Sequence, residues 1–254
     1  MDSLALKLVL TPALIGAASV AGRRWGRGVS GWFVGLPLTS GPVAFFLALD
    51  HGATFAGGAA VGSLAGAIAE AAFALVYGRL ARRDSWLLAL AAGCAAFGAV
   101  AIALQHAPLR LAWLFPAAIV ALALALSLMP RRSATRVAAP LPRWDLPARM
   151  AVTTGLVLLL TGFAPVLGPR LAGLLAAFPL YAAILAVFAH RLEGGAPAVE
   201  VLRGLLLGLF GFAGFFLVVG ASIERVGVAP AFAAAVAVAL TLQAGSLRLV
   251  LDRR

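Results

Sequence analysis

The residue most suited to chemistry is Glu70, because it is the only acid well inside a long apolar stretch, the run from Phe55 to Tyr77. An ionised carboxylate in hydrocarbon is costly, so this side chain must face protein or water, or carry a proton. A carboxyl group in such a place is typical of proton-coupled transport. The alternative is a neutral carboxyl group bonded to a neighbouring helix. We favour the first interpretation and treat Glu70 as a candidate proton site.

A second candidate is an interruption within the apolar stretch 31–52, GWFVGLPLTSGPVAFFLALDHG. It consists of Pro37, Thr39, Ser40, Gly41 and Pro42. Each proline removes a backbone donor and breaks the helix one turn earlier, and nearby hydroxyl groups can bond to the freed carbonyls. Such unwound segments line substrate cavities in many transporters. A purely structural kink, packed against its neighbours, is the alternative.

The interrupted stretch occurs twice. Residues 173–194, GLLAAFPLYAAILAVFAHRLEG, align with 31–52 without a gap at a shift of 142 residues. Pro37 then falls on Pro179, and Tyr181 stands where Thr39 would be. The Tyr181 hydroxyl could bind a ligand, or bond to a backbone carbonyl. The same shift aligns further residues: Thr11 with Thr153, Gly26 with Gly168, Gly62 with Gly204, Gly66 with Gly208, and Gly78 with Gly220. We therefore expect an internal duplication.

Few other side chains suggest a site. Glu70 aligns with Phe212, so a role for the acid would be confined to one repeat. Arg203 lies about two turns inside an apolar stretch and could bind an anion, although an ion pair with Glu200, one turn away, is the simpler interpretation. Cys94 is alone, and no two of the three histidines are spaced for a metal. We find no nucleotide-binding or hydrolase motif, and expect no enzyme activity, no cofactor and no metal.

These residues are carried by a chain that is 63% hydrophobic and only 11% charged. This composition predicts an all-α polytopic membrane protein, because apolar stretches of about 20 residues recur throughout and do not alternate as barrel strands do. A net charge of +11 would suggest nucleic-acid binding in a soluble protein. Here we assign it to the loops on the cytoplasmic side, and expect no nucleic acid as a partner.

Nine spans are expected. They cover residues 4–22, 29–49, 55–77, 86–104, 109–128, 150–167, 171–189, 198–220 and 228–247. The proline-rich loop that follows the fifth span divides the chain. The domains are thus a first four-helix repeat at 1–106, a linking fifth helix and basic loop at 107–148, and a second four-helix repeat at 149–254. Residues 19–21 resemble a signal-peptidase site. We expect no cleavage, because a signal peptide begins with a basic cluster, whereas this chain has Asp2 and no early basic cluster.

Lysine and arginine set the orientation. With nine spans, fifteen of these residues fall on the side of the C-terminus and four on the opposite side, leaving Arg203 inside a span. The N-terminus should therefore lie outside and the C-terminus in the cytoplasm. The odd fifth span inverts the second repeat relative to the first. The interrupted second and seventh spans would then enter from opposite sides and meet near the midplane.

The segment 172–190, AGLLAAFPLYAAILAVFAH, resembles the core of the GlpM-like and DUF3147-like families of small bacterial inner-membrane proteins. Those are single four-span units, so the resemblance implies a duplicated version, clearer in the second repeat. In the first, Leu36 precedes the proline and Ala48 replaces His190. The families have a loose association with envelope polysaccharide production. The plan is also similar to small transporters in which inverted copies are fused.

From these observations we expect a multi-pass protein of the bacterial inner membrane that is a secondary transporter of an unidentified small molecule, with proton-coupled export as one form of this function. The path would run between the second, third, seventh and eighth spans. Its partners would be the lipid bilayer and the small-molecule substrate, and a homo-oligomer is compatible with the sequence. The alternative function is that of a non-transporting membrane component or scaffold of an envelope polysaccharide or lipid assembly system.

Overall fold

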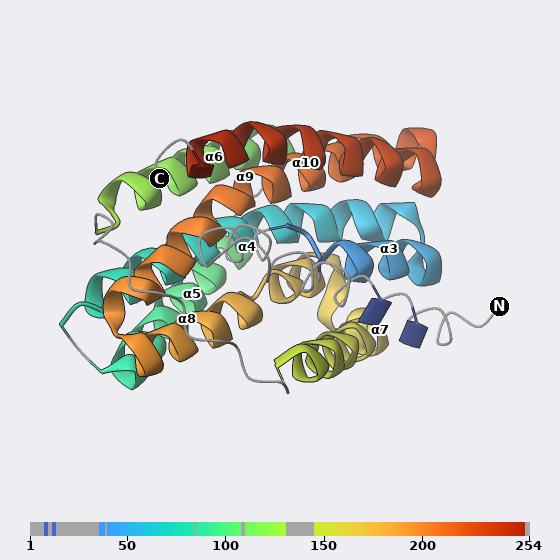
Figure 1. Ribbon diagram of the computed structural model, residues 1–254. Coiled ribbons are helices and arrows are strands. Elements are labelled where there is room, and N and C mark those ends of the chain that lie inside the picture. Colours follow the sequence, from blue (N-terminus) through green and yellow to red (C-terminus); the bar gives the residue numbers. More distant parts are fainter. Residues whose placement is uncertain are drawn as a thin grey trace.

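The computed structural model describes residues 8–9, 12–13, 36–38, 40–83, 85–107, 110–130 and 145–251. Every element of more than two residues in these ranges is a helix (Figure 1). The helices are α3 (Ser40–His51), α4 (Ala53–Leu80), α5 (Trp86–Gln105), α6 (Leu111–Leu128), α7 (Asp145–Ala176), α8 (Leu180–Glu193), α9 (Gly195–Val226) and α10 (Val228–Leu251). The expected all-α architecture is confirmed for the described part of the chain.

Within the described residues, six helical segments are long and apolar enough to cross a membrane, against nine expected spans. The first expected span, 4–22, lies almost wholly outside the described residues, and the second is helical only from Ser40. The sixth and seventh fall in one apolar segment, Val157–Glu193. The structure therefore supports a multi-pass membrane protein.

Helix α7 is bent rather than straight. Gly168 interrupts it with φ 72° and ψ 166°, between Pro165 and Pro169. This backbone conformation is open only to glycine, and a proline on either side also limits a regular helix. The last turns of α7, Pro169–Ala176, are thus a separate short helix that leads to the second interruption.

Helices α4 and α9 form the centre of the bundle and run antiparallel (Figure 1). A methyl group on Gly57, near the start of α4, would lie 3.4 Å from Glu224 Oε1, near the end of α9. At the other end, a methyl group on Gly195 would overlap the backbone of Ala81. Of their most apolar 18 residues, 72% are buried in α4 and 67% in α9, against 22% in α5, α6 and α10.

The helix boundaries repeat along the chain. Helix α3 ends at His51 and α8 at Glu193, 142 residues later. The same distance separates the first residues of α4 and α9, Ala53 and Gly195, and those of α5 and α10. The joints repeat as well, because Gly52 has φ 87° and ψ 170° and Gly194 has φ 97° and ψ 179°. The 142-residue spacing of the sequence is therefore also the spacing of the helices.

The short helices flank the central pair at opposite ends of the bundle (Figure 1). Helix α3 packs on α10, where the rings of Phe45 and Phe232 lie 5.3 Å apart. Helix α8 follows a segment that packs on α5, where the rings of Phe178 and Phe97 lie 5.1 Å apart. Each short helix therefore contacts an outer helix as well as the central pair, and α3 also packs on α7, where His51 Nε2 lies 3.5 Å from Thr161 O.

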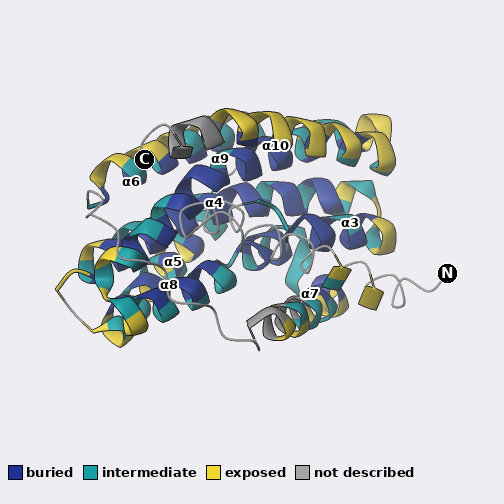
Figure 2. Ribbon diagram, viewed as in Figure 1, coloured by how far each residue is buried: buried dark blue, intermediate teal, exposed yellow. Residues whose placement is uncertain are grey.

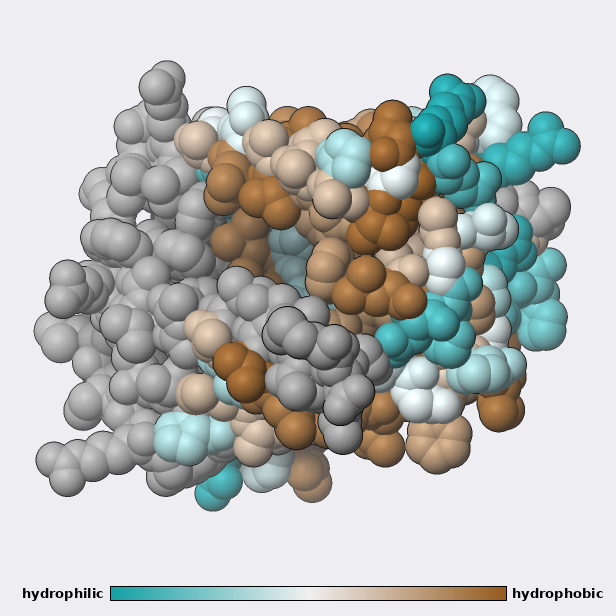
Figure 3. Space-filling view, turned by 90° about the vertical axis from the view of Figure 1, so that its right-hand side faces the viewer, coloured by the Kyte–Doolittle hydropathy of each residue, from teal (hydrophilic) through white to brown (hydrophobic). Residues whose placement is uncertain are grey.

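Large apolar side chains cover the outer surface. Trp113 on α6 is 77% exposed, Ile102 on α5 is 66% exposed, and Val166 on α7 is 85% exposed. Figure 2 shows the exposed positions along the outer faces of α10 and α5, with the buried positions on α4 and α9. On the face in Figure 3, hydrophobic side chains occupy the middle and hydrophilic ones gather toward one side. Lipid is the solvent that suits such a surface.

Candidate functional site

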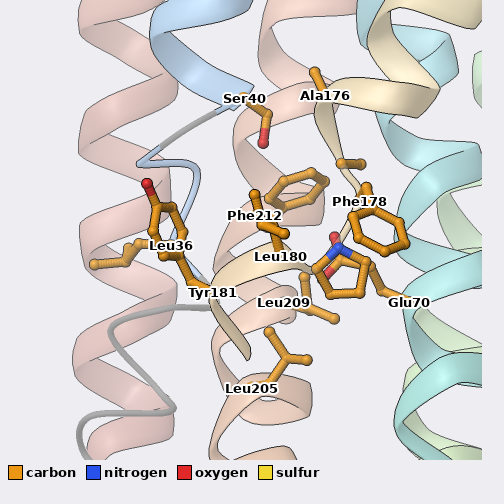
Figure 4. Close-up of a pocket in the computed structure, with 12 residues that line it drawn as sticks. Leu36, Ser40, Glu70, Ala176, Phe178, Leu180, Tyr181, Leu205, Leu209 and Phe212 are labelled. Carbon is orange, nitrogen blue, oxygen red and sulfur yellow. The ribbon is translucent and has the colours of Figure 1, made fainter. Parts of the chain in front are cut away.

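A pocket lies where the two interrupted segments meet the central helices (Figure 4). It has a free volume of about 30 Å³, which is room for about two water molecules. The first interruption contributes Leu36 and Ser40, and α4 contributes Glu70. The second interruption contributes Ala176, Ala177, Phe178, Pro179, Leu180 and Tyr181, and α9 contributes Leu205, Leu209 and Phe212.

The two interruptions have the same backbone hydrogen bonds. In the first, Leu38 N donates to Leu36 O at 2.7 Å, and Gly41 N donates to Pro37 O at 2.8 Å. In the second, Leu180 N donates to Phe178 O at 2.7 Å, and Ala183 N donates to Pro179 O at 2.8 Å. Every one of these residues has its counterpart 142 positions away. The two prolines therefore direct the chain in the same way.

Each interruption is a tight turn centred on its proline. Pro179 has φ −78° and ψ 51°, which is the conformation of an inverse γ-turn. The proline carbonyl then accepts the first helical hydrogen bond, and a new helix begins, α3 at Ser40 and α8 at Leu180. The first residues of both helices line the pocket. Two helix N-termini, with their first backbone N–H groups, are thus directed at one space.

Glu70 reaches this pocket from α4. Its side chain is only 4% exposed, and Figure 4 shows it extending toward Phe178 and Leu180. The structure records no hydrogen bond from the Glu70 carboxyl group to any described residue. The same holds for the Ser40 hydroxyl, which is also 4% exposed and points into the pocket (Figure 4). Buried polar groups normally have partners, so two without a described partner in one pocket indicate a place for a ligand or water.

A close crossing of α4 with the end of α7 holds this geometry. Gly62 and Gly173 face each other, because a methyl group on Gly62 would overlap the Arg170 carbonyl and one on Gly173 would overlap the Ala59 carbonyl. Ser63 Oγ donates to Gly173 O at 3.1 Å across the same crossing. Small residues allow such an approach of two membrane helices. The crossing brings the second interruption against Glu70.

The structure brings four of the nine residues expected at the site into one pocket. Glu70, Ser40, Pro179 and Tyr181 line the pocket, and Pro37 forms the turn that precedes α3. A methyl group on Gly41 would lie 3.6 Å from the Phe215 ring, an ordinary contact distance, so α3 passes α9 closely at this residue. Pro42 is buried in the first turn of α3 and does not line the pocket. Thr39 lies outside the described residues.

Arg203 does not line the pocket. Its Nη1 atom donates to the carbonyl oxygens of Leu126, Met129 and Pro130, at 3.2, 3.4 and 3.4 Å. Arg79 donates to Leu128 O from Nε and Nη2, at 3.4 and 3.3 Å. Two arginines from the central helices thus satisfy the terminal carbonyl groups of α6. Arg203 thus contacts the end of α6, and its expected place in the substrate path stays a prediction.

Several pocket residues were not expected from the sequence. Phe212 faces the same space as Glu70 from the equivalent position of α9, and Leu36 and Phe178 are equivalent to each other. The repeat could have indicated both pairs, because a pocket between two related segments must be lined by equivalent positions. Leu209 and Leu205 lie one and two helical turns before Phe212, and nothing in the sequence distinguishes them from the many other leucines.

One acid and two helix N-termini provide the polar chemistry of the pocket. Among the described residues, no three His, Cys, Asp or Glu side chains are grouped as a metal ion would need. Glu70 can take up a proton, and two helix N-termini can hold negative charge. Comparisons with protein-family models, with curated proteins and with solved structures find no match to this chain. The resemblance to GlpM-like proteins therefore stays a prediction.

Proposed function

We propose that this protein is an integral membrane secondary transporter of a small molecule, with the pocket as its substrate site and Glu70 as its proton site. The observation that carries the proposal is the pocket itself. It combines two interrupted helices, an acid that is 96% buried and a serine, with no described hydrogen-bond partner for either side chain. A purely structural protein gains nothing from burying an unpaired carboxyl group, because the cost of burial is not offset.

The arrangement of the halves supports an inverted-topology repeat. Helices α4 and α9 begin 142 residues apart and pack antiparallel, and the interruptions before α3 and α8 share their hydrogen bonds. In transporters built this way, one repeat rocks against the other around a site near the midplane. We place the site of this protein at the corresponding point.

We further propose that the membrane is the bacterial inner membrane, with the N-terminus outside and the C-terminus in the cytoplasm. The distribution of lysine and arginine supports this orientation. The competing function, a non-transporting component of an envelope assembly system, would need no water-accessible cavity between the two repeats. Access of water to the pocket therefore separates the two functions.

Cysteine labelling tests this access, because Cys94 is the only cysteine and can be replaced by alanine. In that background, Ser40→Cys and Leu180→Cys place a thiol at each interruption, and Leu122→Cys is a buried control on α6. A membrane-impermeant maleimide is added to intact cells and to inverted vesicles. We expect both pocket cysteines to react from both sides and the control to react from neither. Pocket cysteines that resist labelling from both sides would favour the non-transporting function.

A further inference from the structure

The charges around the pocket indicate which ligand it can hold. Helices α3 and α8, of 12 and 14 residues, both begin at the pocket. The N-terminus of a helix acts as about half a positive charge. Of the described residues that line the pocket, Glu70 alone has a charged side chain, and Tyr181 is the only other titratable one.

These charges balance only when Glu70 is ionised. Two helix N-termini contribute about one positive charge together, and an ionised carboxylate contributes one negative charge. When Glu70 takes up a proton, the pocket is left with about one positive charge. With Glu70 protonated, this positive charge would repel a cation. With Glu70 ionised, a cation would still lie beside two positive helix N-termini. A monovalent anion restores the balance.

Among the described residues, no other charged group alters this balance. Along α4, the next titratable group is Tyr77, two turns away, whose hydroxyl lies 3.4 Å from His190 Nδ1. On α9, the nearest charged residue is Arg203, which contacts the end of α6. Helix α5 presents Phe97 behind Phe178. Arg170 on α7 and the Asp50–His51 end of α3 lie more than a helical turn from the lining residues of their own elements.

We propose that the pocket binds a small monovalent anion when Glu70 is protonated, so that proton and anion occupy the protein together as a neutral pair. This inference rests on the proposed transport function and names its substrate class. The Ser40 hydroxyl and the first N–H groups of α8 would donate to the anion. A volume of about 30 Å³ restricts its size. The walls of Leu205, Leu209 and Phe212 favour a weakly hydrated anion, such as nitrate or thiocyanate, over sulfate.

Binding of the anion and of the proton should be linked. Once Glu70 is mostly ionised, the affinity for nitrate should fall by up to tenfold for each unit of pH. Glu70→Gln imitates the protonated acid, so this variant should bind nitrate equally well at pH 5 and pH 8. Glu200→Gln removes an acid from α9 that does not line the pocket, and serves as the matched control.

The experiment uses the purified full-length protein in two assays. Thermal unfolding in detergent compares sodium nitrate with sodium gluconate and sodium sulfate at pH 5 and pH 8. Proteoliposomes that contain a pH-sensitive dye report proton entry when an inward gradient of sodium nitrate or sodium thiocyanate is applied. We expect nitrate to raise the melting temperature more at pH 5 than at pH 8, and the nitrate gradient to acidify the lumen. Glu70→Gln should lose the acidification and keep nitrate binding, while Glu200→Gln should behave as the wild type.

Two results would overturn the inference. One is that nitrate and thiocyanate stabilise the protein no more than gluconate at either pH. The other is proton movement driven by gradients of potassium or choline gluconate and not by any anion gradient. The second result would leave a transporter with a different substrate, so the proposed function would survive it. Failure of the proposed transport function would be detected by a different experiment, the cysteine labelling described above, if the maleimide labels neither pocket cysteine.

Discussion

The crossing of α4 with the end of α7 yields the sharpest stability prediction, for the substitution Gly62→Ala. A β-carbon at Gly62 would lie 2.8 Å from the carbonyl carbon of Arg170 and 3.0 Å from its Cα, and would overlap the carbonyl oxygen. These atoms belong to the backbone, so no side-chain rotation can relieve the overlap. Because carbon atoms pack at about 3.5–4.0 Å, relief of the carbon contacts alone requires the two helices to separate by about 0.5–1 Å, and relief of the overlap with the oxygen requires more.

Three contributions set the magnitude. Alanine in place of glycine favours the helix by about 1 kcal/mol. Forcing an added carbon into a packed contact costs about 1–3 kcal/mol. Separation also lengthens the 3.1 Å hydrogen bond from Ser63 Oγ to Gly173 O, and such bonds between membrane helices contribute about 0.6 kcal/mol. The net expectation is a loss of about 1–2 kcal/mol, or about 2–8 °C in melting temperature.

Thermal unfolding of the purified protein in detergent measures this effect, with Gly98→Ala as the matched control. Gly98 lies inside α5, and a β-carbon there would meet nothing within 4 Å. The control should therefore gain up to about 1 kcal/mol, while Gly62→Ala loses stability. If Gly62→Ala melts at or above the wild-type temperature, the close approach of the two helices described above is wrong.

Three further predictions concern the joints, the end of α6 and the orientation of the halves. Gly52→Ala and Gly194→Ala should each lower the free energy of unfolding by about 1–3 kcal/mol, because a residue with a β-carbon is strained in the positive-φ backbone conformation of these sites. No atom lies within 4 Å of the added β-carbon at either site, so the loss would come from the backbone alone. Variants as stable as the wild type in thermal unfolding would contradict this. Arg203→Ala should lower the free energy of unfolding by about 1–3 kcal/mol, because the hydrogen bonds to three carbonyl groups are lost. Maleimide labelling of a pocket cysteine should be unchanged in this variant. Altered labelling would support a place for Arg203 in the substrate path. Topology reporters inserted after residues 51 and 193 should lie on opposite sides of the membrane, because α4 and α9 begin just after these points and run antiparallel. Reporters on the same side would refute the inverted repeat.

The sequence predicted the local features of the site well, because they depend on residues close together in the chain. Pro37 and Pro179 interrupt their helices since a proline cannot donate a hydrogen bond, whatever surrounds it. Glu70 is buried and lines the pocket, as expected of an acid in an apolar stretch. Gly168, the residue between two expected spans, is where α7 bends.

Features that depend on distant contacts could not be predicted. Arg203 has the same sequence surroundings whether or not it contacts the end of α6, and only the fold shows that the carbonyl groups of Leu126 and Met129 lie beside it. The part played by Gly62 depends likewise on the facing Gly173, 111 positions away. In a composition so rich in alanine and leucine, hydrophobicity alone does not indicate which apolar side chains will surround a pocket.

The pairing of Glu70 with Phe212 has a consequence for how such a site can evolve. In a symmetric homodimer, the same position of both subunits would face the shared pocket, so an acid there would occur twice. Two carboxyl groups in one small apolar space repel each other and cannot both be ionised. A single chain with two separate halves escapes this constraint, since one half can keep the acid while the other supplies an aromatic ring. Covalent linkage of the halves thus permits a site that takes up one proton at a time, and mutations can adjust each side of it independently.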